Sequence, residues 1–130
     1  MSMYCNQCQQ TAKGVACTTR GVCGKDEDVQ SLQEMLIYGL KGIAAYAYHC
    51  RALGKRDEEV DAFMHYALFK TLTNVDFSID DLLGEVLKGG MMNCKAMQML
   101  DAAHRTLRCP HPDEGAHRRE GGSGHIGHRP

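Results

Sequence analysis

Apolar residues recur at steps of three and four along the stretch that follows Asp26, a spacing that places them on one face of a helix. They are Val29, Leu32, Leu36, Leu40, Ile43 and Ala47. Asp26 is a suitable N-cap and Gly54 a natural stop, so the pattern predicts a helix of about 26 residues. Gly39 and Gly42 each cost such a helix about 1 kcal/mol relative to alanine. Close packing of another backbone would make that cost tolerable.

Two later stretches repeat this helical period. The apolar spacing in residues 58–72 predicts a second helix. Its expected buried side is formed by Val60, Phe63, Met64, Ala67 and Leu68. A third helix is expected after Ser78, which begins a sequence resembling a capping box. Its apolar positions are Ile79, Leu82, Leu83, Val86 and Leu87. The pair Gly89-Gly90 is expected to end it, and a last helix is expected over residues 91–103.

Strand patterns are absent, because no segment alternates with period two for long. The fold class predicted is therefore all-α, with an N-terminal cysteine loop, a three- to four-helix bundle and a disordered C-terminal tail. The expected boundaries are residues 1–25 for the loop, 26–104 for the bundle and 105–130 for the tail. At 130 residues the chain is one domain at most.

Composition excludes several classes of function. The chain has 15 basic and 16 acidic residues, and no basic stripe indicates a nucleic-acid partner. No run of eighteen apolar residues predicts a membrane span. The first twenty residues lack the apolar core of a secretory signal. We therefore expect a cytoplasmic protein with neither nucleic acid nor membrane as a partner.

The strongest chemical signal is the spacing of four N-terminal cysteines, Cys5, Cys8, Cys17 and Cys23, which form the pattern C-x2-C-x8-C-x5-C. Four thiolates on one short loop are able to wrap a single inorganic centre. Disulfides are the alternative, but seven cysteines is an odd number and a chain without an export signal belongs in a reducing compartment. The pattern favours metal ligation.

The spacing separates iron–sulfur from zinc poorly. Structural zinc sites favour two close pairs, and the C-x5-C pair here is wider. A redox dithiol at C-x2-C is a third reading, but no thioredoxin-like βαβ pattern surrounds it. Basic residues on or beside the loop, Lys13, Arg20 and Lys25, are placed to offset the negative charge of a thiolate-bound centre.

The residues around the cysteines resemble the sequences of a known family. Tyr4-Cys5-Asn6-Gln7-Cys8-Gln9-Gln10-Thr11-Ala12-Lys13-Gly14, then Cys17, then Gly21-Val22-Cys23-Gly24-Lys25, closely resemble the N-terminus of the hybrid cluster proteins, also called prismane proteins or hydroxylamine reductases. The likeness continues in the segments at residues 36–42, 68–75 and 95–104, and so covers residues 3–104.

The resemblance implies that Cys5, Cys8, Cys17 and Cys23 bind a 4Fe-4S cluster, since family members with a 2Fe-2S centre space these cysteines more widely. In the family this cluster relays electrons, delivered by a redox donor protein, to a hybrid 4Fe-2S-2O cluster that reduces hydroxylamine to ammonia and water. Reduction of nitric oxide is also attributed to the family. The hybrid cluster and hydroxylamine are expected only for the full-length protein.

The chain departs from the family at the hybrid cluster, whose ligands come from later domains. Cys50, Cys94 and Cys109 match none of those ligands, and we expect Cys50 and Cys94 to be small core residues. His49, His65 and His104 are expected on helices, as surface or packing residues. By this resemblance the chain would contain an electron-relay site and no active site. The chain alone is therefore expected to be inactive.

The last residues, 105–130, are rich in Pro, Gly, Arg and His and have no apolar period, which predicts disorder. The family continues here with a segment like T-K-V-P-I-G-V-K. With codons chosen for the comparison, residues 113–121 read one base later give Thr-Lys-Val-Pro-Ile-Gly-Val-Lys. We therefore expect an out-of-frame tail, produced by a frameshift near His104 that truncated a longer gene.

Three functions remain as hypotheses. The first is the electron-relay domain of a hydroxylamine reductase, truncated before its active site. The second is a stand-alone electron carrier of the ferredoxin type, and the third is a zinc-stapled helical interaction module. The first is preferred because the helices match the family as well as the loop does, and a dedicated carrier would not need them.

Overall fold

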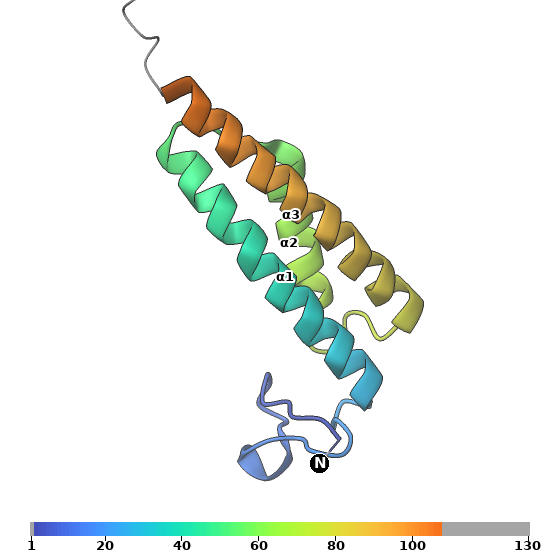
Figure 1. Cartoon of the computed structure of the whole chain (residues 1–130). Coiled ribbons are helices and arrows are strands. Elements are labelled where there is room, and N and C mark those ends of the chain that lie inside the picture. The colour runs from blue at the N-terminus through green and yellow to red at the C-terminus, as the bar shows by residue number, and fades with distance from the viewer. Residues whose placement is uncertain (1, 108–130) are drawn as a thin grey trace, which may run out of the picture.

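The computed structural model describes residues 2–107, which form an N-terminal loop followed by three long helices (Figure 1). The helices are α1 (Glu27–Ala52), α2 (Glu58–Lys70) and α3 (Ile79–Leu107), and the loop contains one short 3₁₀ turn, η1 (Ala12–Gly14). No β-strand occurs within residues 2–107. The predicted all-α fold with a cysteine loop is confirmed.

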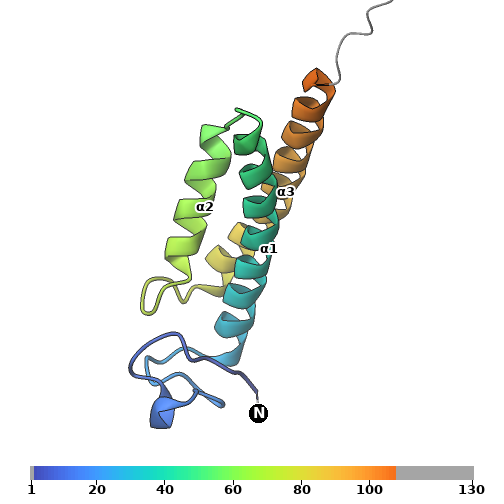
Figure 2. The same ribbon diagram turned by 90° about the vertical axis from the view of Figure 1, so that its left-hand side faces the viewer.

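Helices α1 and α3 lie side by side and run in the same direction, and α2 runs the opposite way beside them, so the bundle is up-down-up (Figures 1 and 2). The loop lies at the end where α1 and α3 begin and α2 ends (Figure 2). The residues of the bundle that bind the loop, Gln30, Gln33 and Thr71, lie at this end.

Helix α1 begins and ends as its sequence predicts. Asp26 is the N-cap and its carboxylate accepts a hydrogen bond from Val29 N–H at 2.9 Å. The helix has 26 residues, and Gly54 follows its end with a φ of +71°, a conformation that glycine adopts without strain. Its apolar face is buried, except that Leu32 is only partly covered.

Helix α2 is capped by Asp57, whose carboxylate accepts from Val60 N–H at 3.0 Å, and it ends at Lys70, two residues earlier than expected. Val60, Phe63 and Ala67 join the core. Leu68, expected on the buried side, is 51% exposed. Met64 is partly buried against the core, so Leu68 is the one position of the predicted side that is exposed.

The prediction that Gly89-Gly90 ends the third helix is wrong, and so is the separate helix over residues 91–103. Helix α3 continues through both glycines to Leu107. Gly89 is buried, and a Cβ there would lie 3.7 Å from the Phe63 ring and 3.9 Å from Leu36. Buried residues follow it at helical spacing, and their packing on α1 outweighs the low propensity of two glycines.

The start of α3 agrees with its sequence, because Ser78 Oγ accepts a hydrogen bond from Asp81 N–H at 3.3 Å. Of its predicted apolar positions Leu82 is buried and Val86 partly so, whereas Ile79, Leu83 and Leu87 are 44–67% exposed. Residues 105–107, assigned to the tail, belong to α3. The rest of the expected tail, residues 108–130, lies outside the described residues.

The core forms where the three helices meet. Its buried members are Val29, Leu36, Leu40, Ile43, Ala47, Val60, Phe63, Ala67, Leu82, Met92 and Ala96. The loop contributes none of them, so it is attached to the bundle by other contacts.

Candidate metal centre

The loop is closed by a backbone pairing between two of the four predicted ligands. Cys5 N–H donates to Cys17 O at 3.0 Å, and Cys17 N–H donates to Cys5 O at 2.8 Å, forming an isolated antiparallel bridge. Next to it, Met3 N–H donates to Thr18 O at 3.2 Å, and Met3 is buried. This pairing brings Cys5 and Cys17 together although eleven residues separate them.

The connection from Cys8 to Cys17 is a tight turn. Cys8 O accepts hydrogen bonds from the N–H and the side-chain hydroxyl of Thr11. The turn η1 follows, where Lys13 and Gly14 both adopt positive φ, +57° and +69°. It directs Ala12 N–H toward Cys17 Sγ, at an N···S distance of 3.4 Å.

Cys17 lies where its surroundings stabilise a negative charge on sulfur. Hydrogen bonds from the backbone N–H groups of Ala12 and Val22 lower the pKa of its thiol and outweigh the opposing effect of burial, and the positive charge of Lys25 adds a smaller lowering. A lowered pKa favours the thiolate, which is the form that binds metal. The chain thus stabilises an anionic sulfur at one predicted ligand position.

Cys23 is held by a turn that depends on Gly21. Gly21 N–H donates to Lys25 O at 2.7 Å, and Gly24 N–H donates to Gly21 O at 2.9 Å. A Cβ at Gly21 would lie 3.1 Å from Cys23 Sγ and 3.2 Å from Lys25 Cβ. A larger residue at this position would collide with the sulfur or with Lys25.

The basic residues of the loop differ in burial. Lys13 and Arg20 are exposed, whereas Lys25 is only 2% exposed. Lys25 Nζ donates to Gln33 Oε1 of α1 at 2.9 Å. Of the three basic residues expected to offset a charged centre, Lys25 is therefore the one built into the interior.

Glutamine side chains attach the loop to the bundle. Gln33 Nε2 donates to Asp76 O at 3.0 Å, and Gln7 Nε2 donates to Thr71 O at 2.8 Å, both on the connection between α2 and α3. Gln30 Nε2 donates to Tyr4 O at 3.2 Å. The roles of these glutamines were not predicted from the sequence. Gln33 does lie on the apolar stripe of α1 between Val29 and Leu36, where a polar residue is itself a signal.

The structure brings some of the predicted ligands together and leaves others apart. Cys5, Cys8, Cys17 and Cys23 are all free thiols. Within the described part of the chain, no group of three or more His, Cys, Asp or Glu side chains is arranged to hold a metal ion. That Cys8 and Cys23 join Cys5 and Cys17 around one centre thus stays a prediction.

The chemistry of the residues present fits an iron–sulfur centre. The donors are sulfur atoms, the ligands that iron–sulfur clusters take. The loop also supplies an N–H group to Cys17 Sγ and a buried cation, and both compensate negative charge on sulfur. Because metal ligation and folding of such loops are coupled, final closure of the four sulfurs is expected to require the metal.

The remaining cysteines and histidines lie outside this loop. Cys50 is fully buried in the bundle, as expected, and burial raises the pKa of its thiol. Cys94 is exposed, so the expectation that it is a core residue is wrong. His49, His65 and His104 are exposed on helices, as predicted. Cys109 lies outside the described residues.

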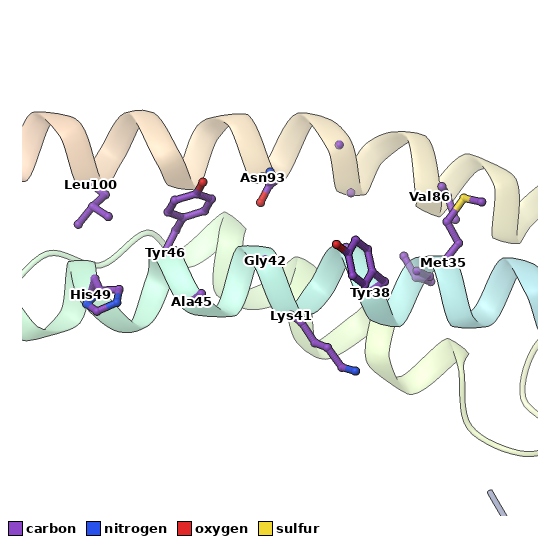
Figure 3. Close-up of a pocket in the computed structure, with 14 residues that line it drawn as sticks. Met35, Tyr38, Lys41, Gly42, Ala45, Tyr46, His49, Val86, Asn93 and Leu100 are labelled. Carbon is purple, nitrogen blue, oxygen red and sulfur yellow. The ribbon is translucent and has the colours of Figure 1, made fainter. Parts of the chain in front are cut away.

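Two hollows lie at different places. A groove of about 820 Å³ runs between α1 and α3, lined by Met35, Gly42 and His49 on α1 and by Val86, Asn93 and Leu100 on α3, among others (Figure 3). It contains no cysteine. A smaller pocket of about 260 Å³ lies beside the loop and is lined by Cys5, Lys25, Gln30 and Gln33, among others.

A helical bundle with a cysteine-rich loop at one end defines the class of the molecule. The chain belongs to the Prismane/CO dehydrogenase family, whose model matches residues 3–88. That span includes all four loop cysteines, together with Lys25 and Gln33.

Individual relatives agree with this family. The hydroxylamine reductase of Moorella thermoacetica is 62% identical over 102 residues, which is 78% of this chain and 24% of that protein. Those of Methanothermobacter thermautotrophicus and Thermotoga maritima are 49% and 50% identical over 113 and 104 residues, covering 26% and 24% of their lengths. The chain spans about a quarter of the length of these relatives.

Helices long and apolar enough to cross a bilayer do not occur among the residues that the structure describes. This finding agrees with the sequence, in which no long apolar run occurs.

Proposed function

We propose that Cys5, Cys8, Cys17 and Cys23 bind one 4Fe-4S cluster, and that the chain is the electron-relay region of a hydroxylamine reductase. Family membership supports an iron–sulfur centre, and similarity to hydroxylamine reductases supports the reaction. The observation that carries the proposal is the Cys5–Cys17 bridge, which places two predicted ligands opposite each other and gives Cys17 Sγ an N–H donor.

Each residue has a part in this function. The four thiolates hold the centre, which when bound would accept and release single electrons. The N–H of Ala12 stabilises charge on Cys17 Sγ, and Gly21 leaves room for Cys23 Sγ beside Lys25. The glutamines fix the loop to the bundle, so the position of the site relative to α1 is defined.

The relay would serve a reaction completed elsewhere in a longer protein. Hydroxylamine, on taking up two electrons and two protons, gives ammonia and water. We propose that this step takes place at a hybrid cluster whose ligands come from later domains of the longer protein, and that a redox donor protein supplies the electrons. The chain alone is therefore proposed to bind a cluster and to show no turnover of hydroxylamine.

Anaerobic analysis of iron and acid-labile sulfide in the purified and reconstituted chain tests the proposal. We expect both elements in a ratio near one, with a broad visible absorbance that dithionite bleaches. Stoichiometric zinc without iron or sulfide would establish the zinc-stapled module instead. Turnover of hydroxylamine by the cluster-loaded chain with any electron donor would contradict the assignment as a relay alone.

A further inference from the structure

Lys25 occupies an environment unusual for a lysine. It is 2% exposed, whereas Lys13 and Arg20 on the same loop lie in solvent. Removing an ammonium group from water carries a large free-energy cost unless a compensating charge or hydrogen bonds are nearby. The burial of Lys25 therefore requires a specific partner.

The hydrogen-bond partner of Lys25 is neutral. Its Nζ donates to Gln33 Oε1 at 2.9 Å, and no described residue forms an ion pair with it. Gln33 is itself 2% exposed and fixed by its hydrogen bond to Asp76 O. This arrangement orients the ammonium but leaves its charge uncompensated.

Three of the predicted sulfur ligands lie on the parts of the loop near Lys25. The missing Cβ of Gly21 marks a point 3.2 Å from Lys25 Cβ and 3.1 Å from Cys23 Sγ. Cys5 and Lys25 line the same pocket beside the loop. The charge of Lys25 also acts on Cys17. Glu34 lines that pocket too, but it accepts a hydrogen bond from Gln30 and forms no ion pair with Lys25. The thiolate site is therefore the source of negative charge that we match to this lysine.

We propose that Lys25 is a positioning residue of the cysteine centre, and that its buried ammonium, oriented by Gln33, stabilises the reduced form of the bound cluster relative to the oxidised form. The inference rests on the proposed function. Reduction adds one electron from an external donor, here dithionite, with no bond made or broken. The added negative charge interacts favourably with a nearby buried cation, which raises the reduction potential.

The test is the reduction potential of the reconstituted 130-residue chain, measured by anaerobic titration with dithionite and electron paramagnetic resonance. Lys25→Met removes the charge at similar length. We expect it to lower the ratio of reduced to oxidised cluster at a fixed potential by about tenfold, equivalent to 59 mV for one electron. Lys25→Arg should restore most of the wild-type potential.

Matched controls distinguish the effect of the buried charge of Lys25 on the reduction potential from the effect of any charge on the loop. Lys13→Met removes an exposed lysine of the same loop, where solvent screens the charge, and should leave the potential near that of the wild type. Gln33→Glu keeps Lys25 but places a carboxylate beside its ammonium, and should lower the potential. Gln10→Glu adds the same charge at an exposed loop position and should have little effect.

The outcomes distinguish the two proposals. A wild-type chain without iron and sulfide would overturn the proposed function, and this inference with it. A cluster-loaded Lys25→Met chain whose potential equals that of the wild type would overturn the role of Lys25 alone. If Lys25→Met fails to fold, as shown by circular dichroism, Gln33→Glu decides: an unchanged potential in that variant refutes the inference.

Discussion

Asn93 on α3 lies against the backbone of Gly42 on α1, so closely that a Cβ at Gly42 would be 3.1 Å from Asn93 Oδ1 (Figure 3). That oxygen is buried, and it has no hydrogen-bond partner among the described residues. The close approach of these two parallel helices explains why α1 carries a glycine here despite its low helix propensity.

Replacing each of the two glycines of α1 by alanine should have different effects on stability. A Cβ at Gly39 would meet nothing within 4 Å, so Gly39→Ala should raise the free energy of unfolding by about 1 kcal/mol. Gly42→Ala should raise the free energy of unfolding by less than Gly39→Ala does, or should lower it, because Asn93 must move. Thermal melts followed by circular dichroism measure both. Equal stabilisation by the two variants would show that Asn93 does not constrain Gly42.

Loss of the Cys17 sulfur should abolish binding of the metal centre. In Cys17→Ser the hydroxyl stays protonated at neutral pH, so the site loses an anionic donor that the surrounding N–H groups stabilise. We expect no visible absorbance after anaerobic reconstitution and a lower melting temperature. Cys94→Ser, which changes an exposed cysteine on α3, is the matched control and should retain the full spectrum. An unchanged spectrum in Cys17→Ser would remove Cys17 from the ligand set.

The stability of the bundle should fall at acid pH in part through Asp57. The N–H of Val60 and the ammonium of Lys95, 3.0 Å away, hold the pKa of this carboxyl below its usual value. The unfolded chain then binds the proton more readily. This contribution is present above the ordinary carboxyl pKa of about 4 and is lost as pH falls through the lower pKa of the folded state.

Two substitutions of Asp57 distinguish the stability that comes from its N-cap hydrogen bond from the stability that comes from its negative charge. Asp57→Ala should cost about 1 kcal/mol at neutral pH, because the N-cap of α2 is lost. Asp57→Asn keeps a capping side chain and should show a weaker dependence of the melting temperature on pH. An acid profile of Asp57→Asn that is as steep as that of the wild type would assign the dependence to other groups.

Apolar residues on the outer faces of the bundle should make the isolated chain self-associate. Leu83, Leu87 and Met91 follow each other at intervals of four on α3 and are 45–67% exposed. Exposed patches of this kind promote association. Light scattering should show species larger than the monomer, and Leu87→Glu should reduce them, whereas Lys88→Glu on the same turn should not. A monodisperse wild-type monomer that binds no hydrophobic dye would contradict this expectation.

Most of the fold follows from local patterns in the sequence. The period of apolar residues and the caps Asp26 and Ser78 locate α1 and the start of α3, because these signals are formed by neighbouring residues. The continuity of α3 could not be read from Gly89-Gly90, since it depends on Phe63 and Leu36, which are distant in sequence. Tertiary packing overrides propensity there.

In the site, too, some features follow from local sequence patterns and others only from tertiary packing. Spacing identifies the four cysteines as candidates, and a resemblance supplies the expected cluster. The exposure of Cys94 and the burial of Lys25 follow instead from how the helices and the loop pack. The buried ammonium of Lys25 is hydrogen-bonded to Gln33, and an amide side chain, which neither ionises nor binds iron, gives no chemical signal in the sequence.

The bridge between Cys5 and Cys17 also has a consequence for handling the protein in air. Residues that exchange both backbone hydrogen bonds have α-carbons about 5.5 Å apart. Disulfides commonly span such a separation. Dioxygen, by removing two electrons and two protons from this pair, would join the sulfurs covalently and occupy two donors. Whether iron or oxygen reaches the reduced polypeptide first then determines which product is isolated.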